Sequence, residues 1–370
     1  YNPLGTIDLS QNTMLEKLLC YNSELVALDL TENTVLNYLR CDVNQLTSLD
    51  LSQNTELTIL NVGDNQLTGL DVTSHSNLTY LHYYKNQLTT VDVSQNPGLI
   101  ALNCFQNELT TLDVTQNTAL THLDCSNNEL PGLDITQNTL LLEVKCRSNQ
   151  IAELDVSQNT AMLSLQCADN ELTSLDVAQN TNLLYLSCDS NQLANIDVSQ
   201  NTSLGSLFCS SNQLTLLDLS QNTALRSLQC SSNQLNCLNV KNGNNTNWLY
   251  FRALNNPDLP CIEVDDVAWS SFNWTHIDST AEFNTDCAIE CVVGIDETGI
   301  SELSIYPNPV ADYVTLDFGK VIDEPTVNIF DGMGRFVSTT RYHSSSSIEL
   351  KMEMPAGVYF LQVSSAEDGN

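Results

Sequence analysis

The sequence predicts a solenoid of stacked coils, with short parallel β-strands and an irregular convex side, followed by a C-terminal antiparallel β-sandwich. Two observations support this prediction. The chain repeats itself every 21 residues from Leu15 to Val240, in eleven copies without an insertion. From Leu303 the repeat gives way to strand-length runs in which apolar and polar residues alternate. We therefore expect the repeats over residues 1–242, a cap over 243–289, a linker over 290–302 and the sandwich over 303–370.

The unit Leu120–Leu140 shows the pattern of the repeat most clearly. A fixed period built on Leu-x-x-Leu-x-Leu-x-x-Asn is typical of leucine-rich repeats. At Leu123–Cys125 and Leu133–Ile135, apolar residues alternate with a polar one as in a β-strand. This pattern predicts that the apolar side chains point inward. Asn128 and its equivalents should satisfy the backbone groups that the turning chain leaves unpaired. Because one unit cannot bury its apolar face alone, stacking on its neighbours must stabilise it.

Nine cysteines occupy the same position in successive units. They are Cys20, Cys41, Cys104, Cys125, Cys146, Cys167, Cys188, Cys209 and Cys230. Val62 and Tyr83 occupy this position in the remaining units, so it takes an apolar side chain. Side chains stacked on parallel strands do not face each other as a disulfide requires, and one thiol per coil does not give zinc its cluster of ligands. We expect free, buried thiols and no bound metal.

These units resemble the 21-residue repeats of the internalin J type of bacterial adhesin, in which a cysteine takes one hydrophobic consensus position. The resemblance covers residues 15–240. It implies that the Leu-x-Cys strands line a concave face and that the Leu-Asp-Val halves form the convex side. The convex half carries an Asp in every coil from Asp8 to Asp218. We expect each Asp to accept hydrogen bonds from nearby backbone N–H groups in an Asx-turn; calcium binding is the alternative.

After Val240 the repeat decays, and bulky apolar residues follow at uneven spacing. The aromatic ones are Trp248, Phe251, Trp269, Phe272, Trp274 and Phe283. An open solenoid end exposes core leucines, so we interpret these rings as the core of a cap, with a carbohydrate platform as the alternative. Four cysteines lie outside the ladder: Cys237, Cys261, Cys287 and Cys291. At least one disulfide is expected, and of the three possible pairings we favour Cys261–Cys287, because it closes the cap on itself.

The last part of the chain contains Tyr306-Pro-Asn-Pro, a Phe-Asp-x-x-Gly turn with Asp331-Gly332 and a Gly-Val-Tyr-Phe strand from Gly357. These segments are similar to the C-terminal sorting domain of the Bacteroidetes type IX secretion system. The resemblance implies an Ig-like sandwich, the secretion machinery as a partner, and a secreted or cell-surface location. That family usually ends in one more strand and a basic tail, which Ser364 to Asn370 lacks, so we expect a truncated end; a copy that does not direct sorting is the alternative. The chain also begins in mid-repeat, so we expect upstream residues to be missing.

Charge and motifs exclude several functions. A net charge of −33 repels phosphate backbones and makes nucleic acid an unsuitable partner. The sequence has no apolar run of the ~20 residues that a membrane span needs. It also contains no Gly-x-Ser-x-Gly, His-Glu-x-x-His, P-loop or Gly-x-Gly-x-x-Gly motif. We expect a monomer without cofactor that is not an enzyme.

Binding is the function that the repeats favour, because solenoids present long concave surfaces. The coils from Leu57 to Arg147 depart most from the consensus. The candidate ligand-binding residues on the outward positions are Tyr38, Arg40, Tyr80, His82, Tyr84, Phe105, Lys145 and Arg147. Aromatic and Arg side chains are common at binding hot spots. We predict a protein or glycan ligand with some negative charge; the alternatives are a structural surface-layer role, or the non-catalytic part of a larger secreted enzyme.

Overall fold

A computed structural model describes residues 4–287, 291, 304–306, 313–322, 324–331, 336–351 and 359–364. The chain forms two compact units, residues 1–293 and 294–370. The first unit is a solenoid and the second contains two small antiparallel sheets. Both parts of the predicted fold class are confirmed.

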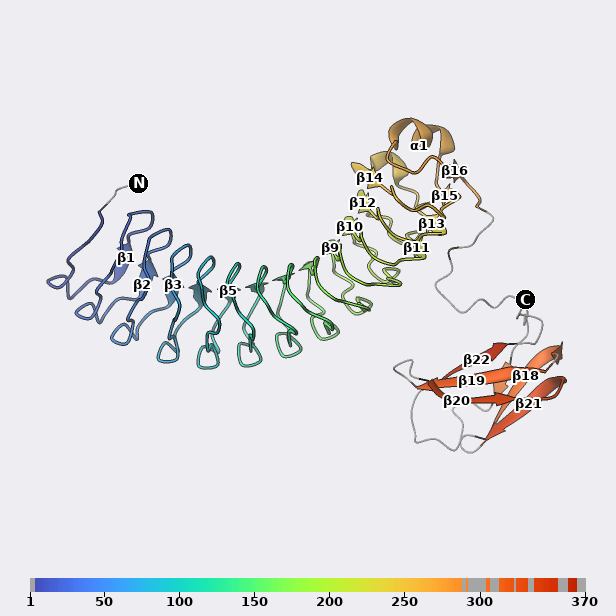
Figure 1. The fold of residues 1–370 in the computed structure, drawn as a ribbon, viewed down its shortest axis with the longest axis horizontal. Coiled ribbons are helices and arrows are strands. Elements are labelled where there is room, and N and C mark those ends of the chain that lie inside the picture. The colour runs from blue at the N-terminus through green and yellow to red at the C-terminus, as the bar shows by residue number, and fades with distance from the viewer. Residues whose placement is uncertain are drawn as a thin grey trace. The chain divides into compact units, whose positions relative to one another are not determined.

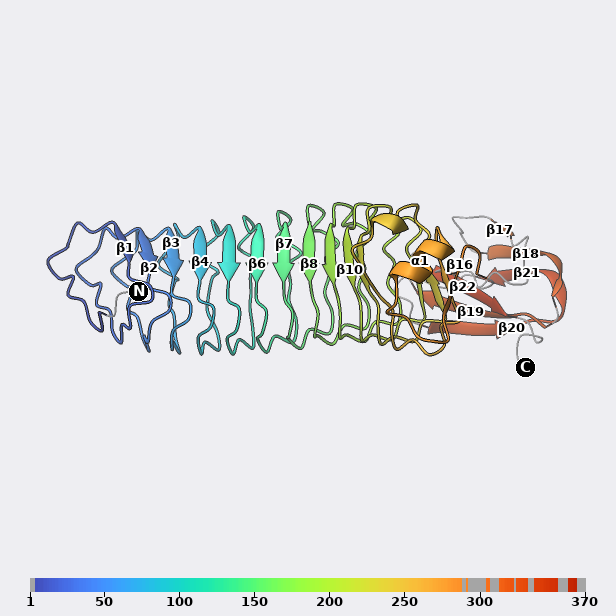
Figure 2. The same cartoon turned by 90° about the horizontal axis from the view of Figure 1, so that it is seen from above.

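The solenoid is built around a 12-stranded parallel sheet with one three-residue strand per coil. Its strands are β1 (Lys17–Leu19), β2 (Tyr38–Arg40), β3 (Ile59–Asn61), β4 (Tyr80–His82), β5 (Ala101–Asn103), β6 (His122–Asp124), β7 (Glu143–Lys145), β8 (Ser164–Gln166), β9 (Tyr185–Ser187), β10 (Ser206–Phe208), β12 (Ser227–Gln229) and β14 (Tyr250–Arg252). Leu18 lies beside Leu39, so the register equals the sequence period. The strands follow the inner side of an arc (Figure 1) and lie side by side when seen from above (Figure 2).

Each coil is held at the end of its strand by the Asn ladder that the sequence predicts. Asn128 Nδ2 donates to the carbonyls of Cys104 and Cys125 at 3.1 and 3.0 Å, and its Oδ1 accepts from Leu109 N–H at 3.0 Å. The residue before each of these Asn side chains has a positive φ, 54° at Asn127. This left-handed turn takes the chain away from the concave face, and the Asn satisfies the backbone groups that the turn exposes.

A second ladder, which the sequence analysis missed, runs along the convex half. Its members are Asn33, Asn54, Asn96, Asn117, Asn138, Asn159, Asn180, Asn201 and Asn222, all buried. Asn54 Nδ2 donates to the carbonyls of Leu30 and Asn33 at 3.0 and 2.9 Å. His75 takes the same place in its own coil, with Nε2 3.2 Å from the Leu51 carbonyl. Both edges of the coil are therefore fixed by side chains that bond to the preceding coil.

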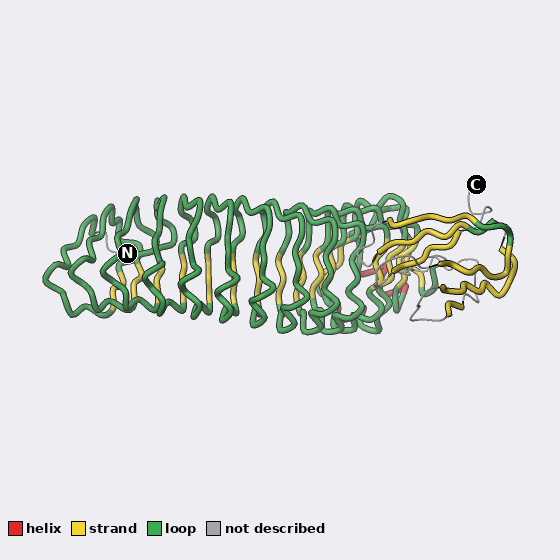
Figure 3. Tube along the Cα trace, turned by 90° about the horizontal axis from the view of Figure 1, so that it is seen from below, coloured by secondary structure: helices red, strands yellow, loops and turns green. Residues whose placement is uncertain are grey.

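The convex side is irregular in most coils, as the sequence predicts, and becomes a regular sheet in the last ones. Seen from below, most of the coil backbone is loop (Figure 3). A four-stranded parallel sheet then forms from β11 (Leu216–Asp218), β13 (Cys237–Asn239), β15 (Cys261–Glu263) and β16 (Glu282–Asn284). The first positions of β11, β13 and β15 hold Leu or Cys, where earlier coils hold small or polar residues such as Ser48, Gly69 and Thr90.

The cap continues the solenoid with a 3₁₀ turn, η1 (Asn245–Asn247), and a short helix, α1 (Val267–Asn273). Trp248 and Trp274 are buried, and the Trp274 ring stacks on Phe251 with 4.3 Å between ring centroids. The prediction that Phe272 belongs to this core is wrong, because its side chain is 84% exposed. Phe272 lies four residues after Ala268, so both fall on the outward face of α1.

Two disulfides close the cap. Cys261 is bonded to Cys287, the pairing that the sequence analysis favoured, and Cys237 is bonded to Cys291. Cys237 and Cys261 begin neighbouring strands of the convex sheet. The bonds therefore tie the end of the described cap to the last coils.

The second unit holds its core between two three-stranded sheets. One sheet has the order β17 (Ser304–Tyr306), β18 (Tyr313–Ile322), β21 (Ser345–Lys351), and the other has the order β20 (Phe336–Arg341), β19 (Thr326–Asp331), β22 (Tyr359–Ser364). Val314, Leu316 and Phe318 from β18 pack with residues of β19 and β21. The Pro-Asn-Pro run after Tyr306, the turn after Asp331, Gly357, the linker over 290–302 other than Cys291, and the tail after Ser364 lie outside the described residues.

Candidate ligand-binding face

We call the outward residues of the main sheet the concave strip. Each coil contributes three of them: the first and last residues of its strand, and the residue two positions after the strand ends. The central apolar residue of each strand is buried, as Leu81 is in β4, and its two neighbours face outward. Strand periodicity thus places all eight candidate residues on this strip: Tyr38, Arg40, Tyr80, His82, Tyr84, Phe105, Lys145 and Arg147. They do not form one cluster. The aromatic residues belong to the coils of β2, β4 and β5, while Lys145 and Arg147 belong to the coil of β7.

Tyr84 is held in place by a glycine that the sequence analysis did not single out. A Cβ atom added at Gly63 would lie 2.3 Å from Cε1 of Tyr84, so the ring fills the space of the missing side chain. Tyr80, on β4, is 39% exposed, and Phe105 is half-buried. A glycine one period before an outward aromatic residue is the sequence signal that would have found this arrangement.

Arg40 is not available as a free positive charge. Its Nε and Nη2 donate to the two carboxylate oxygens of the buried Asp42 at 3.1 and 3.2 Å. Its guanidinium also lies 4.9 Å from the ring centroid of Tyr21. Both Tyr21 and Asp42 were missed as site residues, although each stands in the same outward column as Tyr84. Arg40 therefore organises the first coils of the strip.

The other two basic candidates also have carboxylate partners. Lys145 Nζ lies 3.0 Å from Glu143 Oε1, and Arg147 Nη2 lies 3.9 Å from Asp169 Oδ2. These pairs are half-buried or exposed, so each contributes little to stability, but each neutralises its cation. The expectation of a ligand with negative charge rested on free cations and loses that support.

His82 and Tyr84 both lie close to the Arg40–Asp42 pair. Burial, and then the nearby Arg40 charge, lowers the pKa of His82, which favours the neutral imidazole. Burial, followed by the Asp42 charge, raises the pKa of Tyr84, so the phenol stays protonated. The coils of β2 to β4 thus present neutral rings beside an internally compensated ion pair.

A second aromatic pair lies further along the strip. Tyr185 and Phe208 have ring centroids 5.5 Å apart, with an interplanar angle of 42°. Asp189 lies in the same region, where its carboxylate accepts from Ser187 Oγ at 3.0 Å and from Ser210 N–H at 2.9 Å. Burial raises the pKa of Asp189. The adjacent coils present small residues, Ser164 and Ser206, beside this pair.

The cysteine ladder does not supply catalytic or metal-binding groups. All nine ladder cysteines are free and buried, as the sequence predicts. Burial raises the pKa of Cys104 to about 12, with similar shifts along the column. A thiol that stays protonated and enclosed is a poor nucleophile and a poor ligand. Within the described ranges, no group of three or more His, Cys, Asp or Glu side chains is placed to hold a metal ion.

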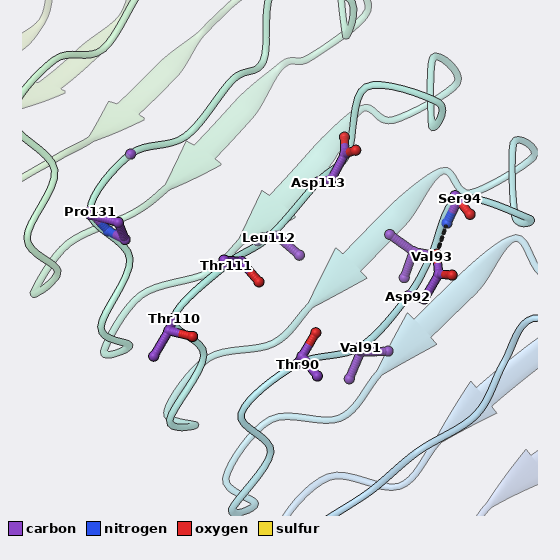
Figure 4. Close-up of a pocket in the computed structure, with 11 residues that line it drawn as sticks. Thr90, Val91, Asp92, Val93, Ser94, Thr110, Thr111, Leu112, Asp113 and Pro131 are labelled. Atoms are coloured by element: carbon purple, nitrogen blue, oxygen red, sulfur yellow. Dashed lines mark hydrogen bonds between the residues drawn. The ribbon is translucent and has the colours of Figure 1, made fainter.

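A hollow of about 440 Å³ lies on the convex side and is shown in Figure 4. It opens beside Gly132, which leaves a gap where neighbouring coils carry Thr90 and Thr111. Asp92, on its edge, accepts a hydrogen bond from Ser94 N–H at 2.9 Å (dashed in Figure 4). The hollow is open to solvent, and this carboxylate is engaged in its own turn, so we assign no site to it.

Comparison with solved structures identifies the repeats. The functional domain of InlJ from Listeria monocytogenes, whose structure includes a cysteine ladder, is 42% identical, with a TM-score of 0.64. That match covers 68% of this chain and 59% of the InlJ chain, so the chain spans under two thirds of that structure's length. The chain is a leucine-rich repeat protein with a cysteine ladder. None of the curated proteins compared with it matches.

Two further structures share the fold of the repeats. A leucine-rich repeat protein of Leptospira interrogans is 22% identical with a TM-score of 0.57, and the match covers 75% of this chain and 81% of that one. Internalin InlF of Listeria monocytogenes is also 22% identical, with a TM-score of 0.56, and the match covers 75% of this chain and 89% of that one. At this identity, both support the fold alone.

The second unit of this leucine-rich repeat protein is a sorting domain. Residues 304–369 match the family described as the secretion system C-terminal sorting domain. The resemblance to the type IX sorting domain is therefore confirmed, and the protein is secreted or displayed at the cell surface. In the described part of the chain, no helix is both long and apolar enough to cross a membrane.

Proposed function

We propose that this protein binds an extracellular protein through the concave strip and has a recognition role rather than a catalytic one. The observation that carries the proposal is the group of rings that we call the aromatic trio: Tyr80 and Tyr84 from the coil of β4, and Phe105 from the coil of β5. Exposed rings on a rigid sheet supply apolar contact area at little cost in conformational entropy, which is why they are common hot spots. A surface without a ligand has no need of them.

The scaffold supports the same proposal. The strip is fixed by consecutive strand pairs such as β4 with β5, and by the Asn ladder at the end of each strand. Tyr84 is fixed against Gly63 before any ligand arrives. A face that is already ordered loses little entropy on binding. The sorting domain takes this face outside the cell, where extracellular ligands are available.

The test replaces Tyr80, Tyr84 and Phe105 together with Ser. We expect the variant to lose at least about 2 kcal/mol of binding to the targets that the wild-type chain recognises in a panel of cells, matrix proteins and glycans. The matched control replaces Tyr185 and Phe208 with Ser, which removes two rings from the same face.

Retained binding of the triple variant, with folding intact by circular dichroism, would contradict the proposal and favour a structural surface-layer role. If the wild-type chain binds only the glycans of the panel, the ligand is a carbohydrate and the proposal of a protein ligand is wrong.

A further inference from the structure

We infer that the aromatic trio receives arginine or lysine side chains from a basic segment of the partner protein. This inference rests on the proposed function and specifies the chemistry of the ligand. It reverses the anionic ligand that the sequence suggests, because the basic residues of the strip already have partners.

The chain itself pairs cations with the rings of the concave strip. Arg40 lies over Tyr21, with 4.9 Å between guanidinium carbon and ring centroid, and Arg252 lies 5.3 Å from the centroid of Tyr250. Lys17 Nζ lies 5.8 Å from the ring centroid of Tyr38. Each of these contacts joins a ring of the concave strip to a basic residue of the same or a neighbouring coil. Their geometry is that of cation–π contacts.

The aromatic trio lacks such a cover. Among the described residues, no arginine or lysine lies over Tyr80, Tyr84 or Phe105. Tyr80 is nevertheless 39% exposed, and packing against Gly63 holds the Tyr84 ring in one position. The trio therefore offers preformed ring faces of the kind that the chain covers with its own cations elsewhere on the strip.

Carboxylates on both sides of the trio supply the countercharge. The backbone N–H of Asp64 donates to the Tyr84 carbonyl at 2.7 Å, which places Asp64 next to Tyr84 in the preceding coil. On the other side, Asp124 of β6 pairs in register with Asn103 of β5, two residues before Phe105. In the part of the chain that the structure describes, neither Asp64 nor Asp124 forms an ion pair.

The wider surface has the same sign. The rim beyond the strip carries Glu108 and Glu129 in neighbouring coils, both exposed. The net charge of −33 makes a second copy of this chain an unsuitable occupant, because two such surfaces repel each other. A basic segment meets both the rings and the carboxylates, and the acidic field speeds its approach.

The experiment titrates the full chain with a short synthetic peptide of arginines separated by Gly-Ser pairs, and with the same peptide carrying citrulline in place of arginine. Citrulline keeps the shape of the side chain and removes its charge. By isothermal calorimetry we expect the citrulline peptide to bind at least about tenfold more weakly. Absence of binding by the arginine peptide, or equal affinity for both, would overturn the inference.

Non-specific attraction between opposite charges is tested with variants that leave the protein's charge unchanged. Gly63→Ala displaces the Tyr84 ring and should weaken binding of the arginine peptide several-fold, whereas Gly69→Ala has no atom within 4 Å of the added Cβ and should not. Tyr84→Leu should weaken it and Tyr84→Phe should not, since phenylalanine keeps the ring face. Equal effects of Gly63→Ala and Gly69→Ala would show that charge alone drives binding, and would overturn the inference.

The result is separable from the proposed function. Suppose that the triple Ser variant loses its targets in the binding panel, but the wild-type chain binds the arginine and citrulline peptides equally well. Recognition through the concave strip is then supported, and the inference of a basic partner segment is wrong. If the triple variant keeps those targets, the proposed function itself fails.

Discussion

The nine ladder thiols behave as small apolar side chains because of where each sulfur lies. Val62 and Tyr83 occupy the same position and are fully buried there, so the position takes apolar side chains and does not require sulfur. Burial raises the pKa of Cys20 to about 11 and that of Cys146 to about 12. At neutral pH nearly all of these thiols are protonated, and protonated thiols do not attack electrophiles.

The prediction at this scale concerns alkylation. Iodoacetamide at pH about 8 should leave the native ladder unmodified, because the reagent needs a thiolate that it can reach. After unfolding in guanidinium without reductant, the mass should rise by nine adducts, since nine cysteines are free and four form two disulfides. Rapid labelling of the native protein, or a mass that shows four or more disulfides, would contradict the buried ladder.

The sequence predicts which face each side chain takes but not its contacts. The period of two along a strand places Tyr84 and Arg40 outward, and both lie outward. The period does not predict side-chain rotamers. The packing of Tyr84 against Gly63 and the Arg40–Asp42 ion pair therefore could not be inferred from it. Phe272 was misplaced for a related reason. The repeat ends before α1, and a short helix without a repeat gives no phase from which to infer its buried face.

At the scale of the coil, the convex Asp column is an array of Asx-turns, as the sequence predicts. Asp113 accepts from Thr115 N–H at 2.9 Å and from Thr115 Oγ1 at 2.7 Å, and Asp155 accepts from Ser157 N–H at 2.8 Å. These hydrogen bonds lower the pKa of both carboxyl groups below the usual 3.8. The carboxylates are exposed, so each local turn is closed without burying a charge.

A lowered pKa in the folded state makes these turns sensitive to acid. The ionised form contributes stability above the unfolded-state pKa near 3.8, and this contribution is lost as the pH falls through the lower folded-state value. Replacing Asp113 and Asp155 with Asn keeps the acceptor oxygens but removes the titration. Wild type should have the higher Tm at pH 6, and the difference should shrink toward zero as the pH falls from about 5 to 2.5. A difference that stays constant across this range would contradict the hydrogen-bond account.

The strands of the main sheet were largely predictable, because a fixed period of 21 residues also sets which residues of neighbouring strands pair. Each unit begins two residues before its strand, from Leu15 for β1 to Leu225 for β12. The convex sheet was not predictable in the same way. Its position has no regular structure in most coils and becomes strand only from Leu216, Cys237 and Cys261 onward. The buried convex Asn ladder was hidden in the Gln-Asn-Thr run, which reads as a polar surface loop.

For the solenoid as a whole, stability depends on how its last coil is closed. Inner coils bury their leucines against two neighbours, and the last regular strand, β12, has a second partner beside β10 only because β14 of the cap continues the sheet. Trp274 stacks on Phe251 and packs against Trp248, and so covers the end of the core. Removing the cap would expose both apolar surface and unpaired strand edges.

Single substitutions in the cap distinguish its core from its surface. Trp274→Ala should lower the free energy of unfolding by about 3–5 kcal/mol, the usual cost of removing a buried aromatic side chain. Phe272→Ala is the matched control, since its ring is 84% exposed and should change stability by less than about 0.5 kcal/mol. A truncation that ends at Val240 removes the whole closure, including Cys261 and Cys287, and we expect it to aggregate when followed by light scattering. A soluble truncated chain that unfolds cooperatively in urea would contradict the capping role, because it would mean that the stacked coils close their own end.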